Sequence, residues 1–349
     1  MKKKILFLPD AGPTNPFQSQ LITFLQQHGF KVAKDRARRF LTTYQAFKQF
    51  KPDIIYYDWI QSFILSKTLL VTLLKCVSFW LELLYVTRFR RIPILHTLHN
   101  MRNHAGHWRK IEYYVYRYFL QRCTRIRVYS ETTRIKAARY FKLDKKKIFV
   151  VQDVPFHHYY PNASGRAESR HILNLDEYTF VYLFLGMIKP YKGLEDLIAA
   201  FQQMDLSSTC LLIAGAGDNA AYENSIREKI KTHPNILFHN RFIAVDAVQH
   251  YMNAADVVVL PFRHIEHSGS VDLALSFKKP VITRKTSFLQ QLLTHQQQLL
   301  FDQNSQSLYN TLQTAQKMNL NAIGQQNFII AEQSNYGDLL LFFSFNQIR

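Results

Sequence analysis

Residues 184–201, FLGMIKPYKGLEDLIAAF, predict the end of a buried strand, a tight cationic turn and an amphipathic helix in succession. The apolar run 181–185 is typical of a parallel strand buried on both faces, and Gly186 ends it. Lys189 and Lys192 lie in the turn, and apolar residues recur at helical spacing after it. Two ammonium groups beside a helix N-terminus suit a diphosphate, although a solvated surface turn with two ordinary lysines fits this stretch equally well.

A second segment of the same kind lies at residues 254–282. Its β-branched run 257–260 predicts a buried strand that ends at Pro261, after which a polar loop opens the next helix. The loop contains Glu266, His267, Ser268, Gly269 and Ser270. An open parallel sheet binds its ligand at the carboxyl ends of such strands, so two anion sites in one α/β unit favour a phosphate-bearing ligand.

These motifs resemble those of the GT-B glycosyltransferases of group 1, the GT4-like family. The family's G-x-[IL]-x-x-x-KG turn is matched by Gly186, Ile188, Lys192 and Gly193. Its glycine-rich strand end, its next buried strand and its PVI strand are matched in the same order by residues 214–217, 251–261 and 280–282. A TLHN strand end at 97–100 and an SG-x-x-x-LA helix start at 268–274 are similar to those of the bacterial exopolysaccharide and lipid-linked-sugar branch.

The resemblance implies an α/β protein of GT-B fold, with two Rossmann-like, doubly wound domains that face each other across a cleft. A length of 349 residues suits two domains. We expect an acceptor-side, membrane-facing domain at residues 1–155 and a nucleotide-sugar-binding domain at 156–330. The polar stretch 151–178 predicts the linker, and a C-terminal helix in 331–349 is expected to pack back on the first domain.

The resemblance also implies the donor contacts. They are expected at Gly186, Lys189, Lys192, Gly215, Glu266, Ser268, Gly269, Ser270 and Asp272. Two positions depart from the family pattern. Lys189 stands where the family has arginine, which keeps the charge but loses the bidentate fork. Of the family's paired glutamates, Glu266 fits the first, the second falls on Ala274, and only Asp272 is nearby. The retaining or inverting outcome therefore stays open.

Candidate residues of the first half follow predicted strands. His99 ends the strand predicted at residues 92–100, and by resemblance it matches a histidine that faces the donor sugar. If the reaction inverts, a general base must take the acceptor proton, and the candidates are His99, Asp58 and Asp10. Acceptor contacts are expected at Gly12, Asn15 and Asn100. The histidines His96, His99, His104 and His107 match no complete ligand set, so we expect no metal.

The formal charge of +19 belongs entirely to the first half of the chain. Residues 1–150 contain 29 Lys and Arg against 8 Asp and Glu, whereas residues 151–349 contain 15 against 17. Such asymmetry predicts a partner that is a polyanion, an anionic lipid or a diphosphate-bearing acceptor. The alternative function is that of a non-catalytic polyanion- or nucleic-acid-binding protein. No nucleic-acid-binding signature is found, and both predicted phosphate sites lie in the neutral half.

The most apolar segment is residues 63–87, interrupted by Lys67, Lys75 and Glu82. Its longest uncharged run is too short to cross a bilayer, which predicts a helical hairpin or long helix. An internal core helix and contact with a membrane surface are both open, and the arginines that follow favour contact. The three widely spaced cysteines are typical of a reduced compartment.

Together these expectations describe a hexosyltransferase that is cytoplasmic and peripheral on the inner face of the cell membrane. It would move a sugar from a UDP- or GDP-sugar to a lipid-linked saccharide in cell-surface polysaccharide biosynthesis. The nucleotide-sugar is a substrate, and no tightly bound cofactor and no nucleic-acid partner are expected.

Overall fold

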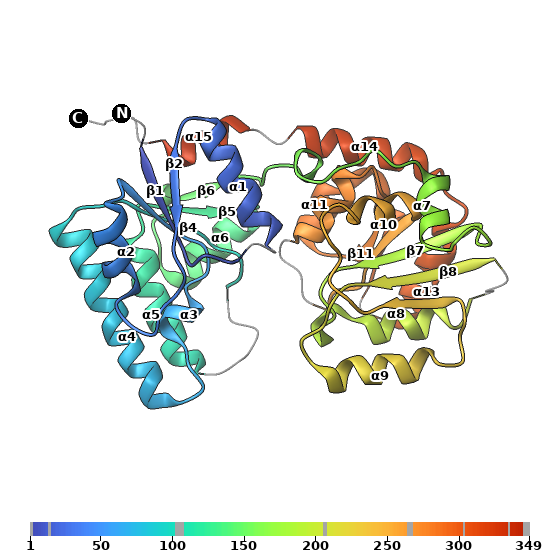
Figure 1. Cartoon of the computed structure of the whole chain (residues 1–349), viewed down its shortest axis with the longest axis horizontal. Helices are drawn as coiled ribbons and strands as arrows, with labels where there is room; N and C mark the ends of the chain where they lie inside the picture. The colour runs from blue at the N-terminus through green and yellow to red at the C-terminus, as the bar shows by residue number, and fades with distance from the viewer. Residues whose placement is uncertain are drawn as a thin grey trace. The chain divides into compact units, whose positions relative to one another are not determined.

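The computed structural model describes residues 3–12, 15–101, 108–204, 208–263, 268–302, 304–333 and 336–344. The chain divides into two compact units, which are shown in Figure 1. The N-terminal unit comprises Met1–Val154 and Asn335–Arg349, and the C-terminal unit comprises Pro155–Ser334. Each unit is built on its own six-stranded parallel sheet.

The sheet of the N-terminal unit has the strand order β2-β1-β3-β4-β5-β6. Its strands are β1 Lys4–Leu8, β2 Lys31–Lys34, β3 Ile54–Tyr57, β4 Ile94–Thr97, β5 Arg125–Val128 and β6 Ile148–Val150. Its helices are α1 Pro16–Gln27, α2 Thr42–Phe50, α3 Gln61–Ile64, α4 Leu69–Leu84 with the π-helical turn Tyr85–Phe89, α5 Arg109–Arg122, α6 Glu131–Phe141 and the C-terminal α15 Tyr336–Phe343.

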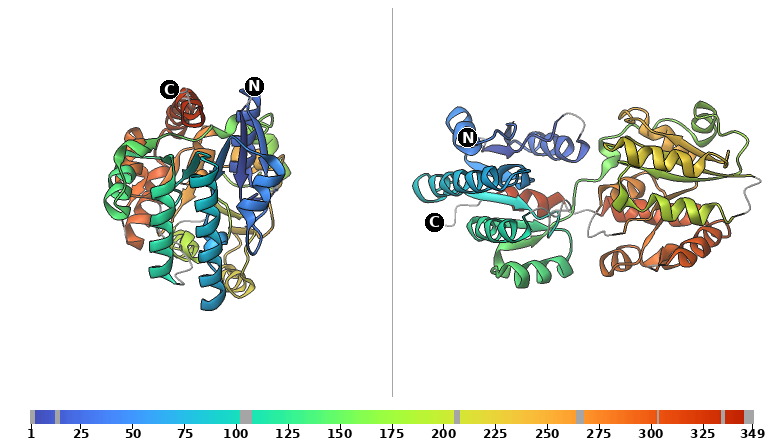
Figure 2. Two further views of the ribbon diagram at one scale, coloured as in Figure 1. Left: turned by 90° about the vertical axis from the view of Figure 1, so that its left-hand side faces the viewer. Right: turned by 90° about the horizontal axis from the view of Figure 1, so that it is seen from below.

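Alternate residues of these strands face two separate hydrophobic cores, as the period of two in a strand requires. Leu6, Leu8 and Tyr57 pack on the side covered by α2 to α6. Figure 2 shows α4 and α5 side by side on that face. Phe7 and Tyr56 face the other way, toward α1 and α15. The last helix of the chain is thus part of the N-terminal core.

The sheet of the C-terminal unit has the strand order β12-β11-β10-β7-β8-β9. Its strands are β7 Phe180–Leu185, β8 Thr209–Ala214, β9 Ile236–His239, β10 Val257–Leu260, β11 Val281–Arg284 and β12 Leu300–Phe301. Its helices are α7 Arg166–Ile172, α8 Leu194–Phe201, α9 Ala220–Ile230, α10 Val248–Ala254, α11 Gly269–Ser276, α12 Ser287–Leu292, α13 Ser305–Ala315 and α14 Leu320–Glu332.

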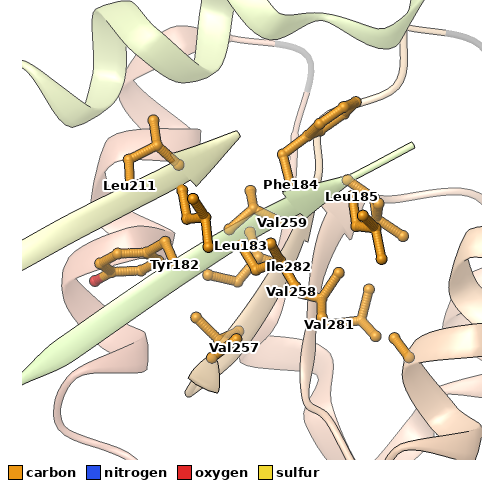
Figure 3. Packing of buried hydrophobic residues seen from close by; sticks show 14 of the residues in the cluster. Tyr182, Leu183, Phe184, Leu185, Leu211, Val257, Val258, Val259, Val281 and Ile282 are labelled. Atoms are coloured by element: carbon orange, nitrogen blue, oxygen red, sulfur yellow. The ribbon is translucent and has the colours of Figure 1, made fainter. Parts of the chain in front are cut away.

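The central strands β7 and β10 are buried on both faces, which explains their continuous apolar sequences. Figure 3 shows Phe184, Leu185, Val258 and Ile282 among the packed side chains of this core. The chain turns back at this point, because β8 and β9 extend the sheet from β7 whereas β10, β11 and β12 extend it the other way. This reversal is a topological switch point, where open α/β sheets bind ligands.

Three sequence expectations differ from the structure. Residues 151–178 are not an open linker, because they contain α7, whose Arg170 donates hydrogen bonds to the carbonyl oxygen of Ala254 and to Asp256. The two-residue strand β12 was not predicted, because so short a run carries no periodicity. Within the described residues, Leu69–Phe89 is one helix long and apolar enough to cross a membrane by length and composition alone.

The short uncharged runs of this segment therefore do not prevent a long apolar helix from forming. The helix contains only two charged residues in its apolar window, and 28% of that window is buried in the protein. Charges interrupt the sequence, but their effect depends on the direction in which each side chain points.

Candidate functional site

Lys192 is the central residue of the candidate site in the C-terminal unit. The 3₁₀ turn Pro190–Lys192 after β7 carries it over the end of that strand, where its side chain is 8% exposed. Its Nζ lies 4.4 Å from the ring centroid of Phe262. Burial, with a smaller effect from the positive charge of Lys189, lowers the pKa of Lys192 to about 8. Among the described residues, none forms a salt bridge with it.

Glycines make room for this lysine. Gly186 has a φ of +150°, and a Cβ there would lie 3.2 Å from Lys192 Nζ and 3.6 Å from Ser270 Oγ. A Cβ on Gly193, whose φ is +72°, would lie 2.2 Å from the carbonyl oxygen of Pro261. The turn after β7 therefore packs directly against the end of β10.

The second predicted phosphate segment meets the first at Gly186. The α11 helix begins at Gly269, and Ser268 caps it by accepting a hydrogen bond from the backbone N–H of Ser270 at 3.2 Å. The Ser270 hydroxyl lies over Gly186, on the same side as the Lys192 ammonium. A buried cation, a hydroxyl and a helix N-terminus thus converge at the switch point, which is the chemistry of a phosphate site.

The two lysines of the turn differ in their surroundings. Lys189 is more exposed and its Nζ pairs with Asp218 at 3.0 Å. Gly215 lies behind the site, because a Cβ there would lie 1.9 Å from the carbonyl oxygen of Gly186. Asp272 is in the first turn of α11. Glu266 lies outside the described residues, so its predicted role stays a prediction.

In the N-terminal unit the structure brings Asp58 and His99 together. Asp58 follows β3 and is fully buried, and its Oδ1 lies 2.6 Å from Nε2 of His99, which follows β4. A carboxylate can only accept a hydrogen bond, so Nε2 carries the proton, and in the neutral imidazole Nδ1 has the lone pair. Nδ1 lies 3.4 Å from the hydroxyl of Tyr129.

The surroundings of this pair were not predicted. Gln18 Nε2 donates to Asp58 Oδ2 at 3.2 Å, and the hydroxyl of Tyr56 lies 3.4 Å from Asp58 Oδ1. The imidazole of His99 stacks on Trp59, with ring centroids 4.9 Å apart, and meets the edge of Phe17. The only sequence signal was the position of Trp59 beside Asp58 at a strand end, because Gln18 looks like an ordinary helical residue.

The remaining predicted residues of this unit lie at the same edge of the sheet. Asp10 follows β1, accepts a hydrogen bond from the backbone N–H of Gly12 at 3.0 Å, and pairs with Lys34 at 3.0 Å. The side chain of Asn15 caps α1 by accepting from the N–H of Gln18, a local structural role. Asn100 is partly exposed directly after His99.

Comparison with known proteins assigns this arrangement to a family. The model of the family described as "Glycosyl transferases group 1" matches residues 165–323, which include all of the described phosphate-site residues. Residues 165–323 are therefore a group 1 glycosyltransferase domain, and the chain has the GT-B fold. The expected fold, family and enzyme class are thereby confirmed.

This glycosyltransferase has relatives of known structure and name. It is 23% identical over 278 residues to a GDP-mannose:glycolipid 4-beta-D-mannosyltransferase of Xanthomonas campestris pv. campestris, covering 78% of this chain and 70% of the relative. Anabaena HepE, solved with UDP and glucose, superposes with a TM-score of 0.71 at 18% identity over 95% of each chain. Sucrose-phosphate synthase from Thermosynechococcus elongatus superposes with a TM-score of 0.75 at 16% identity over 98% of this chain and 97% of that one.

Proposed function

We propose that the enzyme transfers a sugar from a UDP- or GDP-sugar to a lipid-linked saccharide, with the donor diphosphate bound beside Lys192. The observation that carries this proposal is the buried ammonium of Lys192, which forms no salt bridge with any described residue. A buried charge without a counter-ion is costly, and a bound diphosphate supplies the missing negative charge. The convergence of Ser270 and the α11 N-terminus on the same point supports it.

This geometry explains how the C-terminal unit assists bond breaking. Negative charge builds on the leaving diphosphate as the bond between sugar and phosphate lengthens. Lys192 and the Ser270 hydroxyl are held in place before the reaction by the packing around Gly186, so no reorganisation is needed when that charge develops. Lys189 can join them by exchanging Asp218 for a phosphate oxygen.

Acceptor activation belongs to His99 if the sugar is inverted. Asp58 holds the proton on Nε2, so Nδ1 is the nitrogen that can accept the proton of an acceptor hydroxyl. The buried carboxylate then stabilises the imidazolium that forms. Asp58 is a positioning residue, because its side chain is fully buried, and Asp10 is a weaker candidate because it pairs with Lys34.

The lipid-linked acceptor is supported by two observations. The Xanthomonas relative is named for a glycolipid acceptor. The strongly basic N-terminal unit of this chain suits the surface of an anionic membrane or the phosphates of a lipid carrier. These observations support our proposal that the enzyme acts at the cytoplasmic face of the cell membrane, in the assembly of a cell-surface polysaccharide.

A transfer assay tests this proposal. The purified enzyme is incubated with labelled UDP-glucose or GDP-mannose and a bacterial lipid extract, and label in the organic phase is measured beside nucleotide release. We expect transfer with one donor and none without the extract. Absence of transfer from a full panel of UDP- and GDP-sugars, together with tight RNA binding, would instead support the alternative of a polyanion-binding protein.

A further inference from the structure

The outer face of α4 has no charged side chain. Its exposed residues are all apolar, namely Leu69, Leu70, Leu73, Leu74, Val77, Trp80 and Leu81. These positions recur at helical spacing and form one continuous stripe. Soluble proteins usually place polar residues on such a face, so a stripe of this kind indicates a surface that meets a partner.

Neither charged residue of α4 is among the exposed residues, because Glu82 is buried and Lys75 is partly buried. Glu82 is buried and accepts hydrogen bonds from the backbone N–H groups of Thr43 and Tyr44 at the start of α2. Lys75 donates to the carbonyl oxygens of Ser62, at 2.6 Å, and Leu65. Partial burial lowers the pKa of the Lys75 ammonium. The charges that interrupt the sequence therefore do not interrupt the apolar face.

Positive charges border this face at both ends. Every exposed charged residue from Lys67 to Arg91 is basic, and these residues are Lys67, Arg88, Arg90 and Arg91. Phe89 is 77% exposed between two of the arginines. An apolar stripe bordered by arginines and lysines is complementary to a bilayer surface with anionic headgroups, because the stripe enters the acyl region and the cations meet the phosphates.

An apolar hollow adjoins the stripe. It is lined by residues of α4 and α5, with a volume of about 160 Å³, and Trp80 belongs both to this hollow and to the outer face. The other lining residues are Cys76, Phe79, Leu83, Tyr114, Val115 and Tyr118. Its composition suits part of a hydrocarbon chain.

We propose that α4 lies in the plane of an anionic bilayer with its outer face immersed, and that it does not cross the membrane. Crossing would pull the helix off its domain, exposing Phe79 and Leu83 and leaving the α2 N-terminus without the Glu82 carboxylate. The proposal deepens the proposed function, on which it rests for the acceptor's lipid, by naming the surface that brings the enzyme to that acceptor.

Vesicle flotation tests the surface. Wild-type enzyme, with no nucleotide-sugar present, is mixed with vesicles of phosphatidylcholine and phosphatidylglycerol or of phosphatidylcholine alone. We expect binding to the anionic vesicles that weakens with salt. The triple variant Leu74→Ser/Val77→Ser/Leu81→Ser should bind at least ~tenfold more weakly, because each lost apolar side chain removes buried hydrocarbon. Leu341→Ser, an exposed leucine of α15, is the matched control and should bind like wild type.

The depth of Trp80 tests the orientation. Trp80 is near the middle of Leu69–Phe89, so a crossing helix would hold it at the bilayer centre and a surface helix near the headgroups. We expect stronger quenching of vesicle-bound protein by 5-doxyl than by 12-doxyl lipid, and loss of this difference in Trp80→Phe. Three results would overturn the proposal. The first is stronger quenching by 12-doxyl than by 5-doxyl lipid, and the second is equal vesicle binding of the triple variant and wild type. The third is a wild-type protein that binds no vesicles and forms a dimer that the triple variant does not form. Because no donor is present, these results are independent of sugar transfer.

Discussion

At the scale of single residues, Lys192 shows how a functional group can be held at a cost to the free protein. Its pKa of about 8 is below the value of about 10.4 of an unfolded lysine. The free energy of unfolding is therefore reduced while Lys192 is charged in the folded protein. It rises as the pH increases from about 8 to about 10.4, the pKa of the unfolded lysine. The charge that destabilises the free protein is the one that a diphosphate requires.

A pH titration of nucleotide affinity follows from this. Above pH 7, where the nucleotide's terminal phosphate is already ionised, the affinity for UDP or GDP should change little up to pH 8 and then fall by at most tenfold per pH unit, because the free lysine loses its proton. Lys192→Met should remove this break and raise the melting temperature at pH 7. Isothermal titration at several pH values measures the nucleotide affinity, and scanning calorimetry measures the melting temperature. A flat affinity profile from pH 7 to 10 would contradict the assignment.

His99 and Asp58 give a second prediction at this scale. If the sugar is inverted, His99→Ala should lower the kcat of the folded protein by ~10²–10⁴-fold, and added imidazole should restore part of the loss. Asp58→Asn should also lower kcat, with the donor KM unchanged and no rescue by imidazole. Asp10→Asn is the comparison variant and should have a small effect. A lower melting temperature with normal turnover of His99→Ala would indicate a purely structural histidine.

At the scale of elements, buried parallel strands were predictable and segments defined by tertiary contacts were not. The strand β10 was predicted with its observed ends, because a β-branched run before Pro261 can hardly form anything else. The helix α7 was missed because a tertiary contact stabilises its polar sequence: its own Arg170 donates a hydrogen bond to Asp256, which lies in a distant segment of the chain. The same holds for the candidate site residues. Sequence motifs predicted Lys192 and Ser270, whereas only the fold brings Gln18 and Tyr129 close to the Asp58–His99 pair.

The C-terminal helix gives a prediction at this scale. Phe343 of α15 is fully buried, and its ring stacks on Phe7 at 6.3 Å and meets Tyr56 at 5.3 Å. Phe343→Ala should destabilise the N-terminal unit by about 3–5 kcal/mol, the usual cost of such a cavity. Leu341→Ala on the exposed side of the same helix should change stability by less than about 0.5 kcal/mol. Chemical denaturation measures both, and equal effects would show that α15 does not pack as described.

At the scale of the whole molecule, the two units divide the chemistry by charge. The basic N-terminal part holds the apolar stripe of α4 and the Asp58–His99 pair, and the nearly neutral C-terminal part holds the phosphate site. One unit therefore suits an acceptor at a membrane, and the other suits a soluble donor. Net charge alone would have suggested nucleic acid, but the position of the buried lysine in the neutral part points to a nucleotide.

Binding of the donor diphosphate by Lys192 is tested by isothermal titration of UDP and GDP into three proteins. Wild type should bind one nucleotide per chain. Lys192→Met should weaken that binding by about 1.5–3 kcal/mol, or roughly tenfold to a hundredfold, the range for charge-assisted hydrogen bonds. Lys231→Met, which removes an exposed lysine of the same unit, should bind like wild type. Equal affinity of Lys192→Met and wild type, or no binding of either nucleotide to wild type, would contradict the account.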